Sequence, residues 1–241
     1  MKDGSMASKL EEKTRIWLRV DLPAVDYKEA WDLQTFLVEA RKTGIIKNDL
    51  VLLLEHPAVF TLGRNGGSEH MKMSKDFLEQ KGIPVIRVER GGSITFHGPG
   101  QLVVYIIHDL GRSRLGVTEY VNRLEETMKR VSGDWGIHAE RNPVNRGVWV
   151  GENKLGSIGI AVRRGVSFHG FALNVNTSLE PFTWVNPCGL EDVRITSMKE
   201  VLGKELPRKR IRESVCFYIQ EVFGIQLEKV DPDCIVQQGV V

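Results

Sequence analysis

Cysteine is scarce in this sequence, and no stretch of it is apolar enough to span a membrane. The 241 residues include three cysteines, Cys188, Cys216 and Cys234, which lie far apart and form no C-x-x-C pair. These numbers exclude a disulfide framework and a cysteine-based zinc site, and they favour a reducing compartment. The longest apolar runs, residues 50–54 and 102–107, are far shorter than the roughly 18 residues of a membrane helix.

The sequence also lacks a strong excess of one charge. Its 33 Lys+Arg and 31 Asp+Glu residues leave a formal net charge of +2, which argues against a general nucleic-acid binder. Four common motifs are missing: the phosphate loop G-x-x-x-x-G-K-[ST], G-x-G-x-x-G after a strand, the G-x-S-x-G elbow and H-E-x-x-H. Nucleotide-binding, serine-hydrolase and zinc-protease functions therefore lose their usual sequence support.

The composition is that of a globular protein, with 27% charged and 41% hydrophobic residues. Apolar periodicity predicts strands over residues 14–20, 49–55, 59–62, 84–89, 102–107, 148–150, 155–162, 166–175 and 226–230. It predicts helices over residues 23–42, 74–81, 117–132, 197–202 and 207–223. Because no repeat or linker divides the pattern, we expect one α+β domain of mixed β-sheets flanked by helices, spanning residues 14–241. Residues 1–13 are polar and are expected to form a flexible leader, of which residues 1–5 are an added extension.

Three glycine-rich polar segments interrupt the apolar pattern. Residues 90–101 (RGGSITFHGPGQ) combine Arg90 and His97 with glycines that let a ligand approach the backbone closely. Residues 154–159 (KLGSIG) place Lys154 beside two glycines, and residues 186–190 (NPCGL) place Cys188 in an irregular loop. Each has a structural alternative: a hydrogen-bonded loop histidine for His97, a solvated turn lysine for Lys154 and a small buried hydrophobe for Cys188.

A reactive cysteine needs a nearby positive charge that stabilises its thiolate. Lys154, His97 and His169 are the candidates, although a hydrogen-bonded histidine within a sheet is the preferred interpretation of His169. Cys216 and Cys234 are interpreted as core or surface fillers. The basic residues 163–164 and 208–212 fit either a solvated face or a surface for an acidic partner.

Five strings, taken in order, resemble one family. They are residues 55–64 (EHPAVFTLGR), 90–101, 154–159, 164–176 (RGVSFHGFALNVN) and 186–189 (NPCG). The chain therefore resembles the lipoyl(octanoyl) transferases, the lipoate-protein ligase B family. The resemblance implies a single acyltransferase catalytic domain whose fold resembles the catalytic domains of biotin and lipoate protein ligases.

The activity implied by this resemblance is transfer of an octanoyl group through a cysteine thioester. The implied donor is octanoyl-acyl carrier protein. The implied acceptor is a specific lysine of lipoyl domains, in 2-oxoacid dehydrogenase complexes or in the glycine cleavage H protein. We accordingly expect a cytoplasmic monomer with no cofactor, metal, nucleic-acid or membrane partner. Two other functions remain: an ATP-dependent lipoate-protein ligase of the same fold, and a non-catalytic module that binds carrier proteins.

The resemblance also assigns site residues. Cys188 matches the acyl-thioester nucleophile, and Lys154 matches the residue that lowers the pKa of its thiol. The matches to substrate-binding segments are Arg90, Gly91, Gly92, Ser93, Ile94, Thr95, Phe96, His97, Ser157, Ile158, Gly159, Gly170, Phe171 and Ala172. Phe96 departs slightly from the family, which often has tyrosine at this position.

Overall fold

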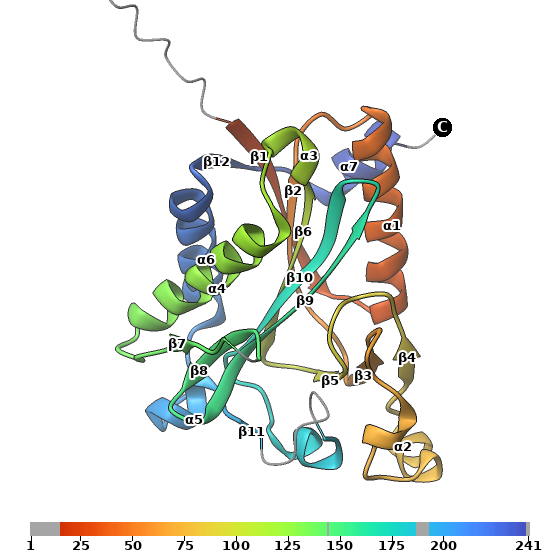
Figure 1. The fold of residues 1–241 in the computed structure, drawn as a ribbon, viewed down its shortest axis with the longest axis vertical. Helices are drawn as coiled ribbons and strands as arrows, with labels where there is room; N and C mark the ends of the chain where they lie inside the picture. Colours follow the sequence, from red (N-terminus) through yellow and green to blue (C-terminus); the bar gives the residue numbers. More distant parts are fainter. Residues whose placement is uncertain (1–14, 144, 187–192, 240–241) are drawn as a thin grey trace, which may run out of the picture.

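The computed structural model of the chain describes residues 15–143, 145–186 and 193–239, which form two β-sheets with helices around them (Figure 1). The strands are β1 (Arg15–Ala24), β2 (Leu50–Glu55), β3 (Val59–Leu62), β4 (Val85–Arg87), β5 (Ile94–His97), β6 (Gln101–Asp109), β7 (Glu140–Arg141), β8 (Gly147–Val150), β9 (Asn153–Arg163), β10 (Val166–Asn174), β11 (Arg194–Ile195) and β12 (Ile225–Lys229). The α-helices are α1 (Tyr27–Thr43), α2 (Lys75–Gln80), α3 (Leu110–Ser113), α4 (Val117–Gly133), α5 (Met198–Leu202), α6 (Arg208–Phe223) and α7 (Pro232–Gly239). The predicted α+β class is confirmed.

The larger sheet has the strand order β12-β1-β2-β6-β10-β9-β8-β7, with β11 added beside β9. Its middle strands β2, β6, β10 and β9 pair antiparallel, whereas β1 pairs parallel with both of its neighbours. The smaller sheet has the order β4-β3-β5 and carries α2 at its outer side (Figure 1). The parallel pairs were not anticipated, because a strand pattern does not encode its partner.

Helices cover both faces of the larger sheet, α1 on one face and α4 with α6 on the other (Figure 1). Strand β2 shows how the two cores are divided. Leu50, Leu52 and Leu54 pack in the cluster that includes α1, and Val51 and Leu53 pack in the cluster that includes α4 and α6. Because successive side chains of a strand point to opposite faces, β2 is buried on both faces of the sheet.

The start of the first long helix differs from the prediction. The sequence pattern placed it at Pro23, but Pro23 lies in β1, and α1 begins at Tyr27 with Asp26 as its N-cap. The pairing of β1 with β2 is irregular between Asp21 and Ala24. A proline, which has no backbone N–H, is tolerated at such an irregularity and not within a regular ladder. The carboxylate of Asp26 accepts a hydrogen bond from the backbone N–H of Lys28, which fixes the start of the helix.

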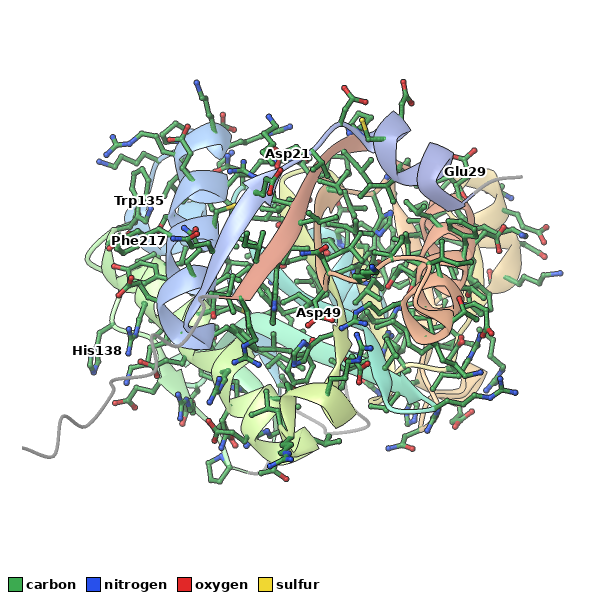
Figure 2. All side chains as sticks on the ribbon, turned by 90° about the horizontal axis from the view of Figure 1, so that it is seen from above. Asp21, Glu29, Asp49, Trp135, His138 and Phe217 are labelled. Carbon is green, nitrogen blue, oxygen red and sulfur yellow. The ribbon has the colours of Figure 1, made fainter. Side chains whose placement is uncertain are left out.

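A buried charge cluster ties α1 to the sheet. Asp49 accepts hydrogen bonds from Arg41 Nε at 2.7 Å, His108 Nδ1 at 2.7 Å and the backbone N–H of Asp109 at 3.1 Å. Asp49 lies inside the molecule, whereas His138 lies at its periphery (Figure 2). Three strong donors compensate the cost of burying this carboxylate.

Two of the cysteines have the places expected of fillers. Cys216 is buried on α6, and burial raises the pKa of its thiol to about 11, while Cys234 is exposed. Within the described residues, none of the helices has the length and apolar character needed to cross a membrane. The leader predicted at the start of the chain lies outside the residues that the structure describes.

Candidate active site

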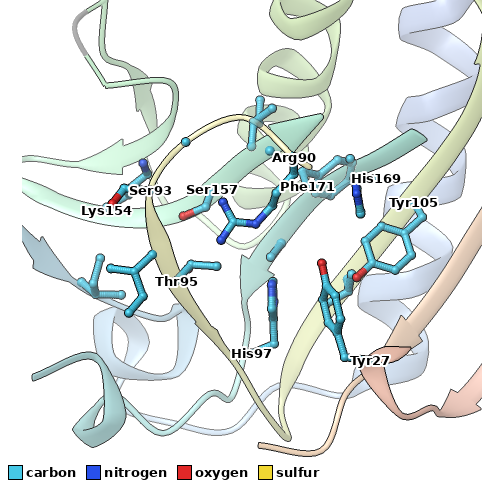
Figure 3. Close-up of a pocket in the computed structure, with 18 residues that line it drawn as sticks. Tyr27, Arg90, Ser93, Thr95, His97, Tyr105, Lys154, Ser157, His169 and Phe171 are labelled. Carbon is cyan, nitrogen blue, oxygen red and sulfur yellow. The ribbon is translucent and has the colours of Figure 1, made fainter. Parts of the chain in front are cut away.

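A pocket opens between the two sheets, and the glycine-rich segments form most of its wall (Figure 3). It holds about 650 Å³ of empty space, its open mouth included. Its lining residues are Tyr27, Arg90, Gly92, Ser93, Ile94, Thr95, His97, Val103, Tyr105, Lys154, Ser157, Ile158, Gly159, His169, Gly170, Phe171, Ala172 and Ile195. Residues from six separate stretches of chain thus meet at one place.

Among the residues that the sequence assigned to substrate binding, Gly91 and Phe96 do not line the pocket. The backbone N–H of Gly91 donates to the carbonyl of Ile160 at 2.8 Å, so this glycine joins the loop to β9. The ring of Phe96 packs against Phe60 and Phe182, with centroid distances of 5.2 and 5.5 Å. Because side chains alternate along β5, Phe96 faces this apolar cluster, whereas Thr95 and His97 line the pocket.

Lys154 lies in β9 and is only 4% exposed, so it is not the solvated turn lysine considered from the sequence. Its ammonium donates a hydrogen bond to Asn145 Oδ1 at 2.6 Å and lies 5.5 Å from the ring centroid of Trp149. The indole N–H of Trp149 in turn donates to the carbonyl of Asn145 at 3.0 Å. The lysine is therefore held at one end of the pocket by two residues that are tied to each other (Figure 3).

Cys188 lies outside the described residues, but the chain on both sides of it is described. Before it, the backbone N–H of Asn186 donates to the carbonyl of His70 at 2.8 Å. After it, Ile195 pairs with Lys154 in the β11–β9 ladder, and the N–H of Thr196 donates to the Lys154 carbonyl at 2.9 Å. The described chain that follows Cys188 thus lies beside Lys154.

Arg90 crosses the middle of the pocket and is 7% exposed. Its guanidinium donates to the Thr61 hydroxyl at 2.7 Å, to the Thr61 carbonyl at 2.8 Å and to the Gly91 carbonyl at 3.0 Å. A Cβ at Gly159 would lie 2.9 Å from Arg90 Cδ, so glycine at this position leaves room for the arginine. These contacts fix the orientation of a buried cation on the pocket wall.

His97 belongs to a chain of hydrogen bonds behind the pocket wall. Its Nδ1 donates to Gln101 Oε1 at 2.7 Å, and Gln101 Nε2 donates to Asn174 Oδ1 at 2.9 Å. Asn174 Nδ2 donates to the carbonyl of Thr196 at 3.0 Å. Burial, together with the charges of His56 and Arg90, lowers the pKa of His97 well below its usual value. A neutral ring with its proton on Nδ1 offers Nε2 as an acceptor, so His97 is both hydrogen-bonded and part of the pocket lining.

A second chain of hydrogen bonds includes two tyrosines. His56 Nδ1 donates to the carbonyl of Val25 at 2.7 Å, which makes Nε2 the acceptor for the Tyr105 hydroxyl at 2.8 Å. Burial lowers the pKa of His56 to about 4, which keeps this ring neutral. Burial and a hydrogen bond with Tyr27 raise the pKa of Tyr105 well above its usual value. The two hydroxyls are therefore neutral and are ordered by the histidine behind them.

His169 has the least usual environment of the lining residues. Its backbone is left-handed, with a φ of 58°, and its N–H donates to Gln34 Oε1 of α1 at 2.7 Å. The residue is 1% exposed, and neither ring nitrogen has a hydrogen-bond partner among the described residues. The sequence favoured a hydrogen-bonded histidine within a sheet. His169 does lie in β10, but within residues 15–143, 145–186 and 193–239 its ring forms no hydrogen bond. A non-glycine residue in this conformation costs about 1–3 kcal/mol.

The groups needed for a metal site are not gathered here. No cluster of three or more histidine, cysteine, aspartate or glutamate side chains that could hold a metal ion occurs within residues 15–143, 145–186 and 193–239.

Some basic residues of stretches 163–164 and 208–212 form contacts within the fold. Arg163 pairs with Glu89 at 2.7 Å, and Arg212 donates to the carbonyl of Leu53 at 3.2 Å. These two of the six basic residues in stretches 163–164 and 208–212 therefore have a structural role.

Comparison with known proteins shows the family of this chain. Residues 26–220 match the model of the lipoyl protein ligase A/B catalytic domain. An octanoyltransferase from Desulfotalea psychrophila is 49% identical over 207 residues, which are 85% of this chain and 93% of that protein. The chain belongs to the lipoyl protein ligase A/B family. It is an acyltransferase of the octanoyltransferase type, as its motifs predicted.

Solved structures of low sequence identity confirm the predicted fold family. The structure of a bi-partite lipoate protein ligase and its E2 lipoyl domain from Thermoplasma acidophilum matches with a TM-score of 0.73 at 16% identity, covering 93% of this chain and 91% of that chain. A biotin protein ligase from Aquifex aeolicus, in complex with biotin and ATP, matches with a TM-score of 0.52 at 13% identity, covering 87% and 70% of the two chains. At these identities the likeness concerns the fold alone.

Sequence analysis of this octanoyltransferase missed several pocket residues, namely Tyr27, Val103, Tyr105 and Ile195. Tyr105 lies in the strand predicted over residues 102–107 and was given no separate role. One signal was available, because a buried tyrosine hydroxyl needs a hydrogen-bond partner. Val103 and Ile195 carry no such signal, because their side chains are apolar and only the fold brings them to the pocket.

Proposed function

We propose that this enzyme takes octanoyl from octanoyl-acyl carrier protein and transfers it to a lysine of a lipoyl domain through a thioester on Cys188. The acceptor domains would be those of 2-oxoacid dehydrogenase complexes or the glycine cleavage H protein. The observation that carries the proposal is Lys154, an ammonium 4% exposed at one end of a pocket that also has apolar walls. A buried ammonium is a costly feature that catalysis can use.

The proposed reaction has two transfers. In the first, the Cys188 thiolate attacks the donor thioester, the carbon–sulfur bond to the carrier breaks, and the carrier thiolate takes a proton from the Lys154 ammonium. In the second, the amine of the acceptor lysine attacks the Cys188 thioester, the Cys188 thiolate leaves, and the neutral Lys154 amine takes the proton that the attacking amine loses. One thioester is exchanged for another and then for an amide, so no ATP is consumed.

The pocket wall supports an acyl chain as the bound group. Ile158, Phe171 and Ala172 line it, and the partner strands meet at Gly159 and Gly170, which have no side chains. Burying each methylene of the chain contributes about 0.8 kcal/mol. A Cβ at Gly170 would lie 2.2 Å from the Val104 carbonyl oxygen. The close approach of β10 to β6 therefore requires glycine here, and this part of the pocket wall has no side chain.

We further propose that the enzyme acts in the cytoplasm as a monomer, with residues 14–241 as one catalytic domain. A reducing compartment is required, because an oxidised Cys188 could not carry an acyl group. The remaining exposed arginines of residues 208–212 would help to dock acidic carrier and lipoyl domains.

The test is to incubate the enzyme with octanoyl-carrier protein, without ATP, and to measure its intact mass. We expect the mass to rise by one octanoyl group in the wild type and in the Cys234→Ser control, and to stay unchanged in Cys188→Ala. A transfer that appears only with octanoate, magnesium and ATP would instead identify a ligase. Carrier binding without any adduct would contradict the thioester mechanism and leave a binding module.

A further inference from the structure

The pocket has a far end, opposite Lys154, that is built from Tyr27, Tyr105 and His169 (Figure 3). Here the wall is polar, although the groups that form it are buried. Tyr27 is 2% exposed, Tyr105 4% and His169 1%. An apolar chain alone offers nothing with which such groups can form hydrogen bonds.

Two of the three side chains at the far end already have partners. The Tyr105 hydroxyl is hydrogen-bonded to His56 at 2.8 Å, and it is also bonded to Tyr27. His169 differs, because both of its ring nitrogens are buried without a partner among the described residues. Its ring stacks on the Phe168 ring with a centroid distance of 4.7 Å and packs edge-to-face with the Tyr105 ring with a centroid distance of 5.9 Å, so these contacts are apolar.

The orientation of His169 is imposed by the surrounding structure. Its left-handed backbone is held by Gln34, whose own amide donates to the Ala30 carbonyl at 3.2 Å. A strained backbone together with unpaired nitrogens is unfavourable for folding, and such features persist mainly where function requires them. Because burial lowers the pKa of His169 to about 3, the ring is neutral and presents one donor and one acceptor.

The distance along the sheet suits a ligand whose carbonyl lies beside Ser157, a pocket residue three positions after Lys154 on β9. Ser157 pairs with Ala172, and His169 lies three residues further along β10. Three residues of strand span roughly 10 Å, about the reach of an extended eight-carbon chain. An acyl group whose carbonyl lies near Ser157 therefore brings its last carbons to His169.

We propose that the far end of the pocket accepts acyl chains that carry a neutral hydrogen-bonding group, such as a hydroxyl, at the last carbon, and that His169 pairs with this group. A hydroxyl both donates and accepts, so it fits either nitrogen of the ring. The inference rests on the proposed acyl transfer and adds a substrate class, the ω-hydroxyacyl groups, to the unsubstituted octanoyl group.

The test compares two carrier thioesters whose chains have equal numbers of heavy atoms, 8-hydroxyoctanoyl and nonanoyl. The measurement is kcat/KM for acylation of Cys188, expressed as the ratio of the two substrates. We expect the ratio to be at least one in the wild type and about tenfold lower in His169→Phe, because a hydrogen bond contributes roughly that factor. His169→Asn keeps a donor and an acceptor, tolerates a left-handed backbone, and is expected to retain most of the ratio.

Equal ratios in the wild type and in His169→Phe would overturn the proposal. So would a wild-type enzyme that prefers nonanoyl by tenfold or more, since an apolar end would reject an unpaired hydroxyl, and this comparison needs no variant to fold. Unsubstituted octanoyl-carrier protein is the separate control for acyl transfer. If the enzyme does not use this thioester, the proposed acyl transfer fails. The preference of the pocket for a terminal hydroxyl is then measured on the wild type as the ratio of its binding constants for 8-hydroxyoctanoate and nonanoate. The inference about the far end requires that this ratio still be at least one.

Discussion

Asn145 provides a sharp test of how Lys154 is used, because its side-chain oxygen accepts from the lysine ammonium at 2.6 Å. A hydrogen bond to a charged group contributes about 1.5–3 kcal/mol, and 1.36 kcal/mol corresponds to one unit on the pH scale. Replacing Asn145 by leucine is therefore expected to favour the neutral amine of Lys154. If the Lys154 ammonium assists the first transfer, the rate of that transfer falls at alkaline pH. In Asn145→Leu this fall should begin about 1–2 pH units lower than in the wild type.

The assay is the single-turnover rate of octanoyl transfer to the enzyme, measured across neutral and alkaline pH. Asn145→Asp is the matched control, because a carboxylate of the same size favours the ammonium and should move the alkaline limb to higher pH. Opposite shifts in the two variants would support an ammonium that acts in the reaction. If both variants leave the alkaline limb where it is in the wild type, Lys154 does not act as a charged group in this step.

Three further outcomes are expected. Lys154→Met should slow acylation and raise the pH midpoint at which Cys188 becomes reactive; an unchanged pH profile of the rate would rule out this role. Gly170→Ala should destabilise the fold by about 2–3 kcal/mol, because its Cβ would lie 2.2 Å from the carbonyl oxygen of Val104; urea unfolding with an unchanged midpoint would contradict this. Burial alone would raise the pKa of Asp49, but its histidine and arginine partners outweigh burial and lower this pKa below 3.8. Asp49→Asn should therefore lower the free energy of unfolding by about 3 kcal/mol at neutral pH. This difference between wild type and variant should persist down to the pKa that Asp49 has in the unfolded chain, and should shrink as the pH falls through the lower pKa that it has in the folded protein. A difference that does not change with pH would refute the reasoning.

Local sequence patterns were sufficient to predict most of the helices and strands. The helix at residues 117–132 was predicted from apolar residues repeating at helical spacing, and α4 covers Val117–Gly133. The helices predicted over residues 74–81 and 197–202 start at Ser74 and Ser197, which the structure shows to be the N-caps of α2 and α5. The start of α1 was misplaced, since Pro23 fits a helix start as well as an irregular strand.

The sequence predicted which residue types form the candidate site but not the contacts between them. Glycines beside Arg90, Lys154 and His97 could be recognised, because segments with glycine and charge inside an apolar pattern are unusual in a core. The contacts that give these side chains their properties could not be recognised. Asn145 lies nine residues before Lys154, and Gln34 lies 135 residues before His169.

The sequence by itself determined the α+β class, the family and the residue types available for chemistry, because strand and helix periods and the five motifs are local in the chain. Only the tertiary structure decided that Lys154 is buried and held by Asn145 and that Tyr27 and Tyr105 complete the pocket. It also decided that the ring nitrogens of His169, at the far end of the pocket, have no hydrogen-bond partner within the part of the chain that the structure describes. Burial and hydrogen-bond partners depend on segments that meet across two sheets, and no local pattern encodes such a meeting.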